Sequence, residues 1–140
     1  MYQVQRKNRI KEELQLVNAD GTVADTITVD LNVDEIAARV SKSYETLGMA
    51  QNALQEDPHS EKLLEAYGNA VTAVFSVIFG EEGCGKILGF YENNYTEMLL
   101  DLFPFINDVI MPKIREASEA RKQQLVNAAK MTKNKHGWGR

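Results

Sequence analysis

The sequence predicts a helix-dominated α+β domain with a β-hairpin at its N-terminus. Two patterns predict this class. Residues 23–31 alternate between apolar and polar types, as a half-buried strand does, whereas apolar residues recur every three or four positions from residue 33 onward, as on one face of a helix. The chain has 140 residues, of which 44% are hydrophobic, so one domain can bury a real core. We expect a single domain over residues 1–126 and a basic, flexible tail over residues 127–140.

A β-hairpin is expected over residues 10–31. The Asp-Gly pair at positions 20–21 marks the turn, because both central residues of a type I′ turn need a positive φ, which this pair tolerates. Closing the hairpin on this pair brings the apolar faces of its two arms together. The predicted facing pairs are Leu14 with Ile27 and Ile10 with Leu31. Because a lone hairpin is marginal in water, it should pack on the helices or join the sheet of another chain.

Two amphipathic helices are expected next. The first should cover residues 33–56, because Asn32 with a glutamate three residues later makes a capping box. Its apolar stripe consists of Ile36, Val40, Tyr44, Leu47 and Leu54. The second helix should cover residues 58–79, with Asp57 as its N-cap and Pro58 at the first helical position. Its wide apolar face predicts that it is the most buried helix.

A glycine-rich segment, residues 80–91, is expected to be a flexible connection with one short helical turn, because Gly80 should end the second helix. Its first part, Gly80–Lys86, matches the phosphate-binding pattern G-x-x-x-x-G-K. Nucleotide binding is nevertheless not expected. Ile87 stands where a Ser or Thr hydroxyl should meet Mg²⁺, a helix precedes the loop in place of a strand, and two glutamates would face the phosphates.

A long third helix is expected over residues 95–126. Asn94 with a glutamate three residues later begins it, and an apolar face continues to Ile114. Pro104 and Pro112 lie inside this region, and each removes a helical hydrogen bond, so a kink or break is expected at one or both. Beyond Ile114 the helical propensity stays high but the apolar side becomes thin.

No catalytic, metal or cofactor site is expected. Cys84 is the one cysteine, so no internal disulfide can form, and a reducing cytoplasm is the simpler setting. A cysteine nucleophile would need a partner histidine, but His59 and His136 stand in polar stretches. The longest apolar stretch, Ala70–Phe79, is about half of a membrane span, and no signal peptide precedes it.

The charge is unevenly distributed along the chain. Residues 1–11 carry a net charge of +4, residues 113–140 of +6, and residues 12–112 of −14. The simpler interpretation is that both basic ends are solvated. The alternatives are charge-complementary packing between copies, or a basic arm that meets an acidic partner or nucleic acid. The C-terminal lysines with Trp138 suit single-stranded nucleic acid, but the acidic body argues against that partner.

A resemblance rests on residues 79–110, which read F-G-E-E-G-C-G-K-I-L-G-F-Y-E-N-N-Y-T-E-M-L-L-D-L-F-P-F-I-N-D-V-I, together with the hairpin and the basic last helix. In this respect the chain resembles small tail proteins of siphophages and Gram-positive prophages, in particular tail assembly chaperone-like proteins. The resemblance implies a protein without enzymatic activity that works in the cytoplasm of the bacterial host. It would bind the tape measure protein during tail assembly and self-associate.

Interaction residues are expected on the third helix and in the tail. Six candidates are singled out: Met98, Leu102, Phe103, Phe105, Ile106 and Trp138. Two other functions remain open. The chain could be a structural tail component of the virion, of the terminator or connector type. It could also be an accessory protein that binds nucleic acid through its basic ends. No membrane or small-molecule substrate is expected as a partner.

Overall fold

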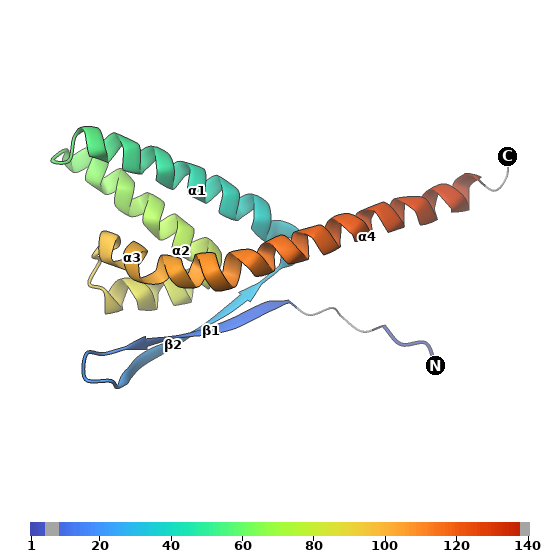
Figure 1. Ribbon diagram of the computed structural model, residues 1–140, viewed down its shortest axis with the longest axis horizontal. Coiled ribbons are helices and arrows are strands. Elements are labelled where there is room, and N and C mark those ends of the chain that lie inside the picture. Colours follow the sequence, from blue (N-terminus) through green and yellow to red (C-terminus); the bar gives the residue numbers. More distant parts are fainter. Residues whose placement is uncertain (5–8, 138–140) are drawn as a thin grey trace.

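The computed structural model describes residues 1–4 and 9–137, with side chains described up to residue 133. It confirms the predicted class, a helix-dominated α+β fold that opens with a hairpin and ends with a long helical region (Figure 1). The elements in chain order are β1 (Ile10–Val17), β2 (Val23–Leu31), α1 (Val33–Glu56), α2 (Glu61–Phe90), α3 (Tyr95–Phe105), the π-helical turn η1 (Ile106–Ile110) and α4 (Met111–Gly137).

The hairpin has the predicted register. Strands β1 and β2 are antiparallel, Leu14 faces Ile27, and Ile10 faces Leu31. The apolar face of the hairpin lies against the helices, where β2 contacts α2. Two acidic residues also lie on this inner face, and each pairs with a lysine from a helix. Glu12 pairs with Lys113 of α4, and Asp25 pairs with Lys86 of α2.

The turn of the hairpin is not the predicted two-residue type I′ turn. Gly21 alone in this loop has a positive φ, of 88°, and its N–H donates to the carbonyl of Asn18 at 2.9 Å. The loop therefore spans Asn18 to Thr22, and a register shift follows between Leu16 and Val17. Asp20 instead accepts hydrogen bonds from the backbone N–H and the hydroxyl of Thr22. These bonds lower the pKa of the Asp20 carboxyl.

Helix α1 has the predicted bounds, and the start of α2 differs. Asn32 caps α1 by accepting from the N–H of Asp34 at 3.0 Å. The N-cap of α2 is Ser60, whose hydroxyl accepts from the N–H of Leu63 at 3.3 Å. The prediction that Asp57 caps this helix and that Pro58 begins it is therefore wrong, because the Asp57 N–H still bonds to a carbonyl of α1.

Helix α2 does not end at Gly80, contrary to the prediction. Gly80 leaves the helical conformation, with φ 76° and ψ 170°, but the chain resumes the helix at once and continues it to Phe90. The predicted glycine-rich connection is thus a second helical half. Cys84 and Ile87 are buried on it, 2% and 0% exposed, so packing against the core stabilises a segment that its glycines would weaken.

The two prolines frame a change of helical form. Between Pro104 in α3 and Pro112 in α4, the turn η1 is π-helical, and the N–H of Met111 donates to the carbonyl of Ile106. Each proline lacks the N–H that continues the regular helical ladder, and a π-helical turn is one of the known distortions of such a ladder. The expected distortion is therefore a π-bulge. The helix then continues to Gly137, well past position 126, where the sequence predicted that a separate tail would begin.

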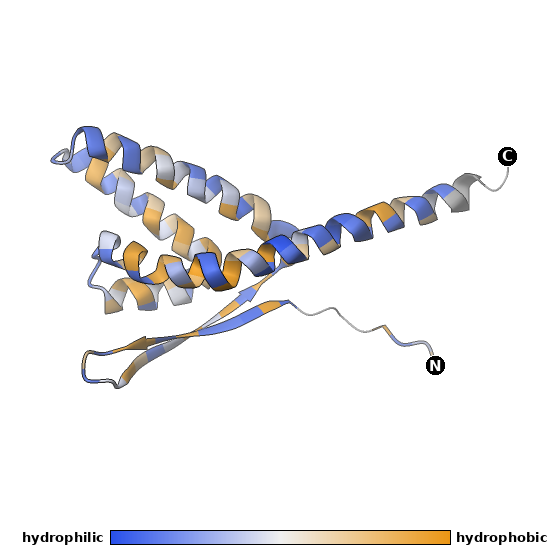
Figure 2. Ribbon diagram, viewed as in Figure 1, coloured by the Kyte–Doolittle hydropathy of each residue, from blue (hydrophilic) through white to orange (hydrophobic). Residues whose placement is uncertain are grey.

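The core is centred on α2. Hydrophobic residues (orange in Figure 2) line α2 and α3 where the body is packed. The largest fully buried side chains are Phe75, Ile27, Ile78, Ile87, Met98, Ile106, Ile110, Val29, Val40, Val71 and Val74. In the described part of the chain, α2 is the one helix long and apolar enough to cross a membrane by length and composition. Within its apolar window 44% is buried inside the fold, where α2 packs on α1 and β2.

The C-terminal half of α4 projects away from the body (Figure 1). Near the point of departure, Nε of Arg121 donates to Oδ1 of Asp34 on α1 at 3.0 Å. From residue 119 to residue 133 every side chain is exposed, including Leu125 at 56% and Met131 at 71%. The projecting segment thus resembles an arm that contacts the body only at its base.

Candidate functional site

An apolar groove of about 470 Å³ lies between α3, the start of η1 and the facing parts of α1 and α2. Its lining residues are Gln51, Tyr67, Thr96, Leu99, Leu100, Phe103, Pro104, Asn107 and Asp108. Most of them belong to one stripe of α3 and η1, with the spacing of three and four residues that one helix face provides. A groove of this form suits an extended apolar surface such as the face of another helix.

Leu99 and Leu100 have different roles in the groove. Leu99 is 5% exposed and belongs to the core, whereas Leu100 is 72% exposed and stands at the rim. A large aliphatic side chain exposed beside an apolar groove loses contact with water only when a partner covers it. Leu100 is therefore the residue on which a test of the groove should act.

The α2 wall of the groove is tied to α3 at one point. The Tyr67 hydroxyl and Thr96 Oγ1 lie 3.1 Å apart and form a hydrogen bond. Gly68, next in the chain, lies directly under the ring of Tyr95, since a Cβ there would be 2.6 Å from Cε2 of that ring. The first turn of α3 is thus held close to α2 at this end of the groove.

An unsatisfied hydroxyl lies on α1, on a residue that packs against the groove-lining Phe103. The Tyr44 ring packs against Phe103 of the groove, with centroids 6.0 Å apart. Its hydroxyl oxygen is buried, and among the described residues it has no hydrogen-bond partner. Burial raises the pKa of the Tyr44 phenol. The contact between α1 and α3 beneath the groove therefore holds a polar group that apolar packing does not satisfy.

The surroundings of the groove are acidic. Asp108 is part of its lining, and the sequence from residue 87 to residue 112 has four acidic residues and no Lys, Arg or His. Tyr91 lies in the same stretch of sequence, and its pKa is raised to about 12, first because of burial and then because of the negative charge of Asp101 on α3. A partner with an apolar face and basic flanks would match this groove best.

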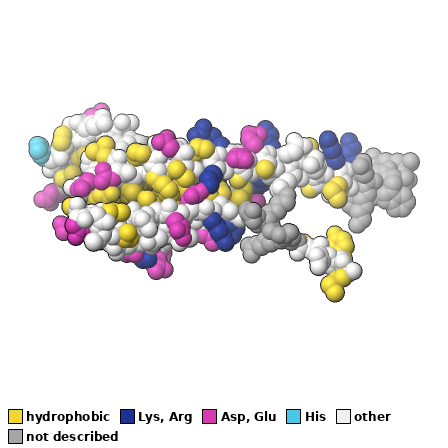
Figure 3. Space-filling model, turned by 60° about the horizontal axis from the view of Figure 1, so that its bottom comes forward, with side chains coloured by type: hydrophobic (Ala, Val, Ile, Leu, Met, Phe, Trp, Pro, Cys, Tyr) yellow, Lys and Arg dark blue, Asp and Glu magenta, His cyan; other side chains and the backbone are white. Residues whose placement is uncertain are grey.

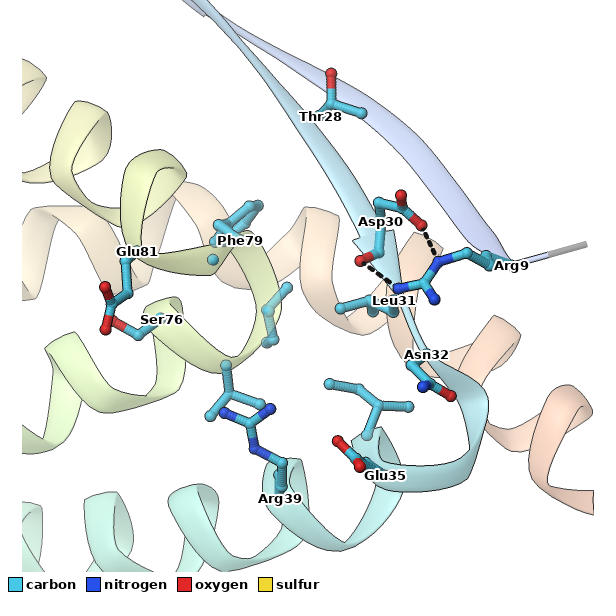
Figure 4. A pocket seen from close by; sticks show the side chains of 14 residues that line it. Arg9, Thr28, Asp30, Leu31, Asn32, Glu35, Arg39, Ser76, Phe79 and Glu81 are labelled. Atoms are coloured by element: carbon cyan, nitrogen blue, oxygen red, sulfur yellow. Dashed lines mark hydrogen bonds and ion pairs between the residues drawn. The ribbon is translucent and has the colours of Figure 1, made fainter.

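A second cavity, of about 430 Å³, lies between the end of β2, the start of α1 and the kink at Gly80 (Figure 4). Arg9 closes one side by pairing with Asp30 at 2.5 Å. Glu35 and Arg39 line it from α1, and Glu81 lines it from α2. Because both signs of charge surround this cavity, it favours neither an anion nor a cation.

The segment that matches the phosphate-binding pattern has a structural role. Lys86 Nζ lies 3.3 Å from Asp25 Oδ1, and 3.4 Å from the carbonyl oxygen of Thr26, to which it donates. Gly83 is buried, and a Cβ there would lie 2.9 Å from Ile27 Cγ2. Gly80 supplies the kink. The glycines and the lysine thus bend α2 and dock it on the hairpin.

The predicted interaction residues fall into three groups. Met98, Leu102 and Ile106 lie in the core, with exposed fractions of 0%, 3% and 0%, so the folded chain does not offer them to a partner. Phe103 and Phe105 are half-buried, and Phe103 lines the groove. Trp138 lies outside the described residues. Leu100, the exposed leucine of the groove, was missed, although its position next to the core residue Leu99 already suggested that the two face different ways.

Groups that could carry chemistry are few in the described part of the chain. Residues 1–4 and 9–133 contain no cluster of three His, Cys, Asp or Glu side chains that could hold a metal ion. Cys84 is buried, its Sγ lies 3.6 Å from the carbonyl of Thr72, and burial raises the pKa of its thiol. His59 is exposed in the turn between α1 and α2 (cyan in Figure 3), and the side chain of His136 lies outside the described residues.

No protein-family model, curated protein or solved structure matches this chain.

Proposed function

We propose that this chain is a non-enzymatic binding protein that holds an amphipathic helix of another protein in the groove beside α3. The observation that carries the proposal is the groove itself, an open apolar surface with the largely exposed Leu100 at its rim. Helix-in-groove binding needs such a surface and no reacting group. The burial of Cys84, which raises the pKa of its thiol, also makes this cysteine a poor nucleophile.

The client we propose is the tape measure protein of a phage tail, in line with the resemblance of residues 79–110 to tail assembly chaperone-like proteins. A long, apolar, helical client has many equivalent segments, and each can occupy one groove. Many weak contacts then keep such a client soluble without any one tight site. The proposed place of action is the cytoplasm of the bacterial host, where tails are assembled.

Co-expression tests the proposal directly. The tape measure protein of the same genome is produced alone, with this chain, and with its Leu100→Asp variant, and the soluble fraction of the tape measure protein is measured. The wild-type chain should raise that fraction several-fold. Leu100→Asp should abolish the gain, because it places a carboxylate in the apolar contact. Leu100 is 72% exposed, so the variant should still fold.

Met49→Asp is the matched control. Met49 is on α1, is 67% exposed, and is not part of the groove. This variant should solubilise the client as the wild type does. A tape measure protein that is no more soluble with the wild-type chain than without it would refute the proposed function. Equal activity of Leu100→Asp and the wild type would refute the groove as the binding site.

Purified virions separate a chaperone from a structural tail component. A chaperone leaves the tail when assembly is complete, so the chain should be absent from mature particles. Its presence at a fixed stoichiometry in washed virions would instead establish the terminator or connector type of role.

A further inference from the structure

We infer that the projecting arm of α4, residues 122–137, docks in the groove beside α3 of a second copy of this chain, so that copies join head to tail. The proposal rests on three features of the described residues. These are an apolar face on the arm that nothing covers, opposite charges on the arm and around the groove, and the position of the two surfaces at opposite ends of the molecule.

The apolar face of the arm continues the core face of α4. Leu125 lies about three helical turns after Ile114 and therefore on the same side of the helix. Ile114 is 3% exposed because the body covers it, whereas Leu125 is 56% exposed because the body has ended. Two small residues, Ala128 and Ala129, extend this side, so another helix can approach it closely.

The charges on the two surfaces are opposite. From residue 120 to residue 137 the chain contains Lys and Arg but no acidic residue, and Lys122, Lys130 and Lys133 are all exposed. Asp108 is the one charged residue among those that line the groove, and α3 and η1, which supply most of the lining, contain Glu97, Asp101 and Asp108 but no Lys or Arg. The basic arm and the acidic side of the groove should therefore attract each other, whereas two basic arms placed side by side would repel each other.

The arm and the groove cannot meet within one chain. In Figure 1 the arm extends from the body on the side opposite to α3 and the turn between α1 and α2. Figure 3 shows acidic side chains at the end of the molecule away from the arm, and Lys or Arg side chains towards the arm. A contact between two different surfaces leaves a free arm at one end of the pair and a free groove at the other, so further copies can add until the assembly closes into a ring or continues as an open chain.

The dimensions of the two surfaces agree. The arm is roughly 24 Å long at 1.5 Å per residue, and the groove-lining stretch from Thr96 to Asp108 is roughly 20 Å long by the same rise. An isolated helix of this length is marginal in water. Docking would therefore stabilise the arm as a helix as well as cover its apolar face.

This inference rests on the groove of the proposed function but not on its client. The same groove would hold the arm of another copy when no client is present, and an amphipathic client helix would displace that arm. The two ideas can fail separately, because one is tested with the purified chain alone and the other with the client.

Sedimentation velocity on the purified chain tests the inference. The wild type should form species that grow with concentration beyond a dimer. Raising the ionic strength from about 50 mM to about 500 mM should shift them towards monomer, because the attraction is then screened. Leu100→Asp damages the groove alone, and Leu125→Asp damages the arm alone. Each variant should remain monomeric under conditions where the wild type and Met49→Asp associate.

Mixing the two damaged variants provides the decisive measurement. Leu100→Asp still has an intact arm and Leu125→Asp an intact groove, so an equimolar mixture should form a dimer that cannot grow further. A wild type that stays monomeric at millimolar concentration would overturn the inference. A mixture that stays monomeric would overturn it as well. Association that is abolished by Leu125→Asp but not by Leu100→Asp would also overturn it, since arms would then pair with arms. Retained client binding by Leu125→Asp would show that the proposed function stands even then.

Discussion

A Cβ atom on Gly83 of α2 would lie 2.9 Å from Cγ2 of Ile27 on β2. Real Cβ atoms do not come this close to a neighbour, so glycine at this position sets the distance between the second half of α2 and the hairpin. Ile27 is 2% exposed and has little room to move. Together with the pairing of Lys86 with Asp25, this contact joins the segment after the Gly80 kink to β2.

Gly83→Ala should therefore destabilise the domain. Overpacking typically costs about 1–3 kcal/mol, and removing a helical glycine returns about 1 kcal/mol, so a net loss of roughly 1 kcal/mol is expected. The urea midpoint measures it. Gly85→Ala is the control, because a Cβ on Gly85 meets nothing within 4 Å. This control should be neutral or slightly stabilising, and an equal loss in both variants would contradict the packing argument.

Gly80→Ala should also destabilise the domain, for a conformational reason. The φ of 76° and ψ of 170° at Gly80 belong to a region that only glycine occupies readily, and other residues pay about 1–3 kcal/mol there. Thermal unfolding followed by circular dichroism checks this. Gly48→Ala, at a helical site with open space around it, should raise stability by up to about 1 kcal/mol. A stabilised Gly80→Ala would mean that α2 can run straight.

Tyr44→Phe should stabilise the domain. The variant removes a buried hydroxyl that has no partner among the described residues, and leaving such a group unpaired costs about 1–3 kcal/mol. The ring contact with Phe103 stays in place. A gain of roughly 1 kcal/mol in the free energy of unfolding is expected on this ground. A clear loss would show that the hydroxyl has a bonding partner in solution, such as a water molecule.

Stability should fall in alkaline solution, in part through Tyr91. Burial and the Asp101 charge raise its pKa from 10.0 to about 12, so the folded state holds the phenol proton more tightly than the unfolded state does. This contribution is fully present below pH 10 and is lost as the pH rises towards 12. Tyr91→Phe should lose less stability than the wild type over that window. Tyr2→Phe, at a residue that is 91% exposed, should behave as the wild type.

Lys86→Ala should change the stability of the domain only slightly, and it should not change the response of the melting temperature to nucleotides. The pair with Asp25 is partly exposed, so a double-mutant cycle with Asp25→Ala should give a coupling of about 0.2–1 kcal/mol. ATP with Mg²⁺ should shift the melting temperature of neither the wild type nor the variant. A shift that Lys86→Ala removes would establish a phosphate site at this segment.

Features set by nearby residues could be predicted from the sequence. The bounds of α1 follow from Asn32 and its apolar stripe, and the hairpin register follows from matching two alternating faces. The Asp-Gly pair located the turn but not its type, because Gly21 alone has a positive φ. Asp20 is instead held by its bonds to Thr22, and such side-chain bonds compete with the standard turn.

Features set by distant contacts could not be predicted. A glycine that leaves the helical conformation usually ends a helix. The part of α2 after Gly80 is instead buried in the core, where Gly83 approaches Ile27, a residue far away in the sequence. The groove was missed for the same reason. Periodicity shows that Met98 and Leu102 share a face with other apolar residues, but it does not show which face the body covers.

The pairing of Glu12 with Lys113 bears on how the protein forms during its synthesis. These partners are 101 positions apart, and the inner face of the hairpin packs on α2, which the ribosome makes later than the hairpin, as it does Lys113 of α4. At a synthesis rate of roughly 5–20 residues per second, several seconds pass between the synthesis of the hairpin and that of the helix that packs on it. Its apolar side is exposed during that interval, so the earliest element of the chain is also the one most open to wrong pairing with neighbouring nascent chains.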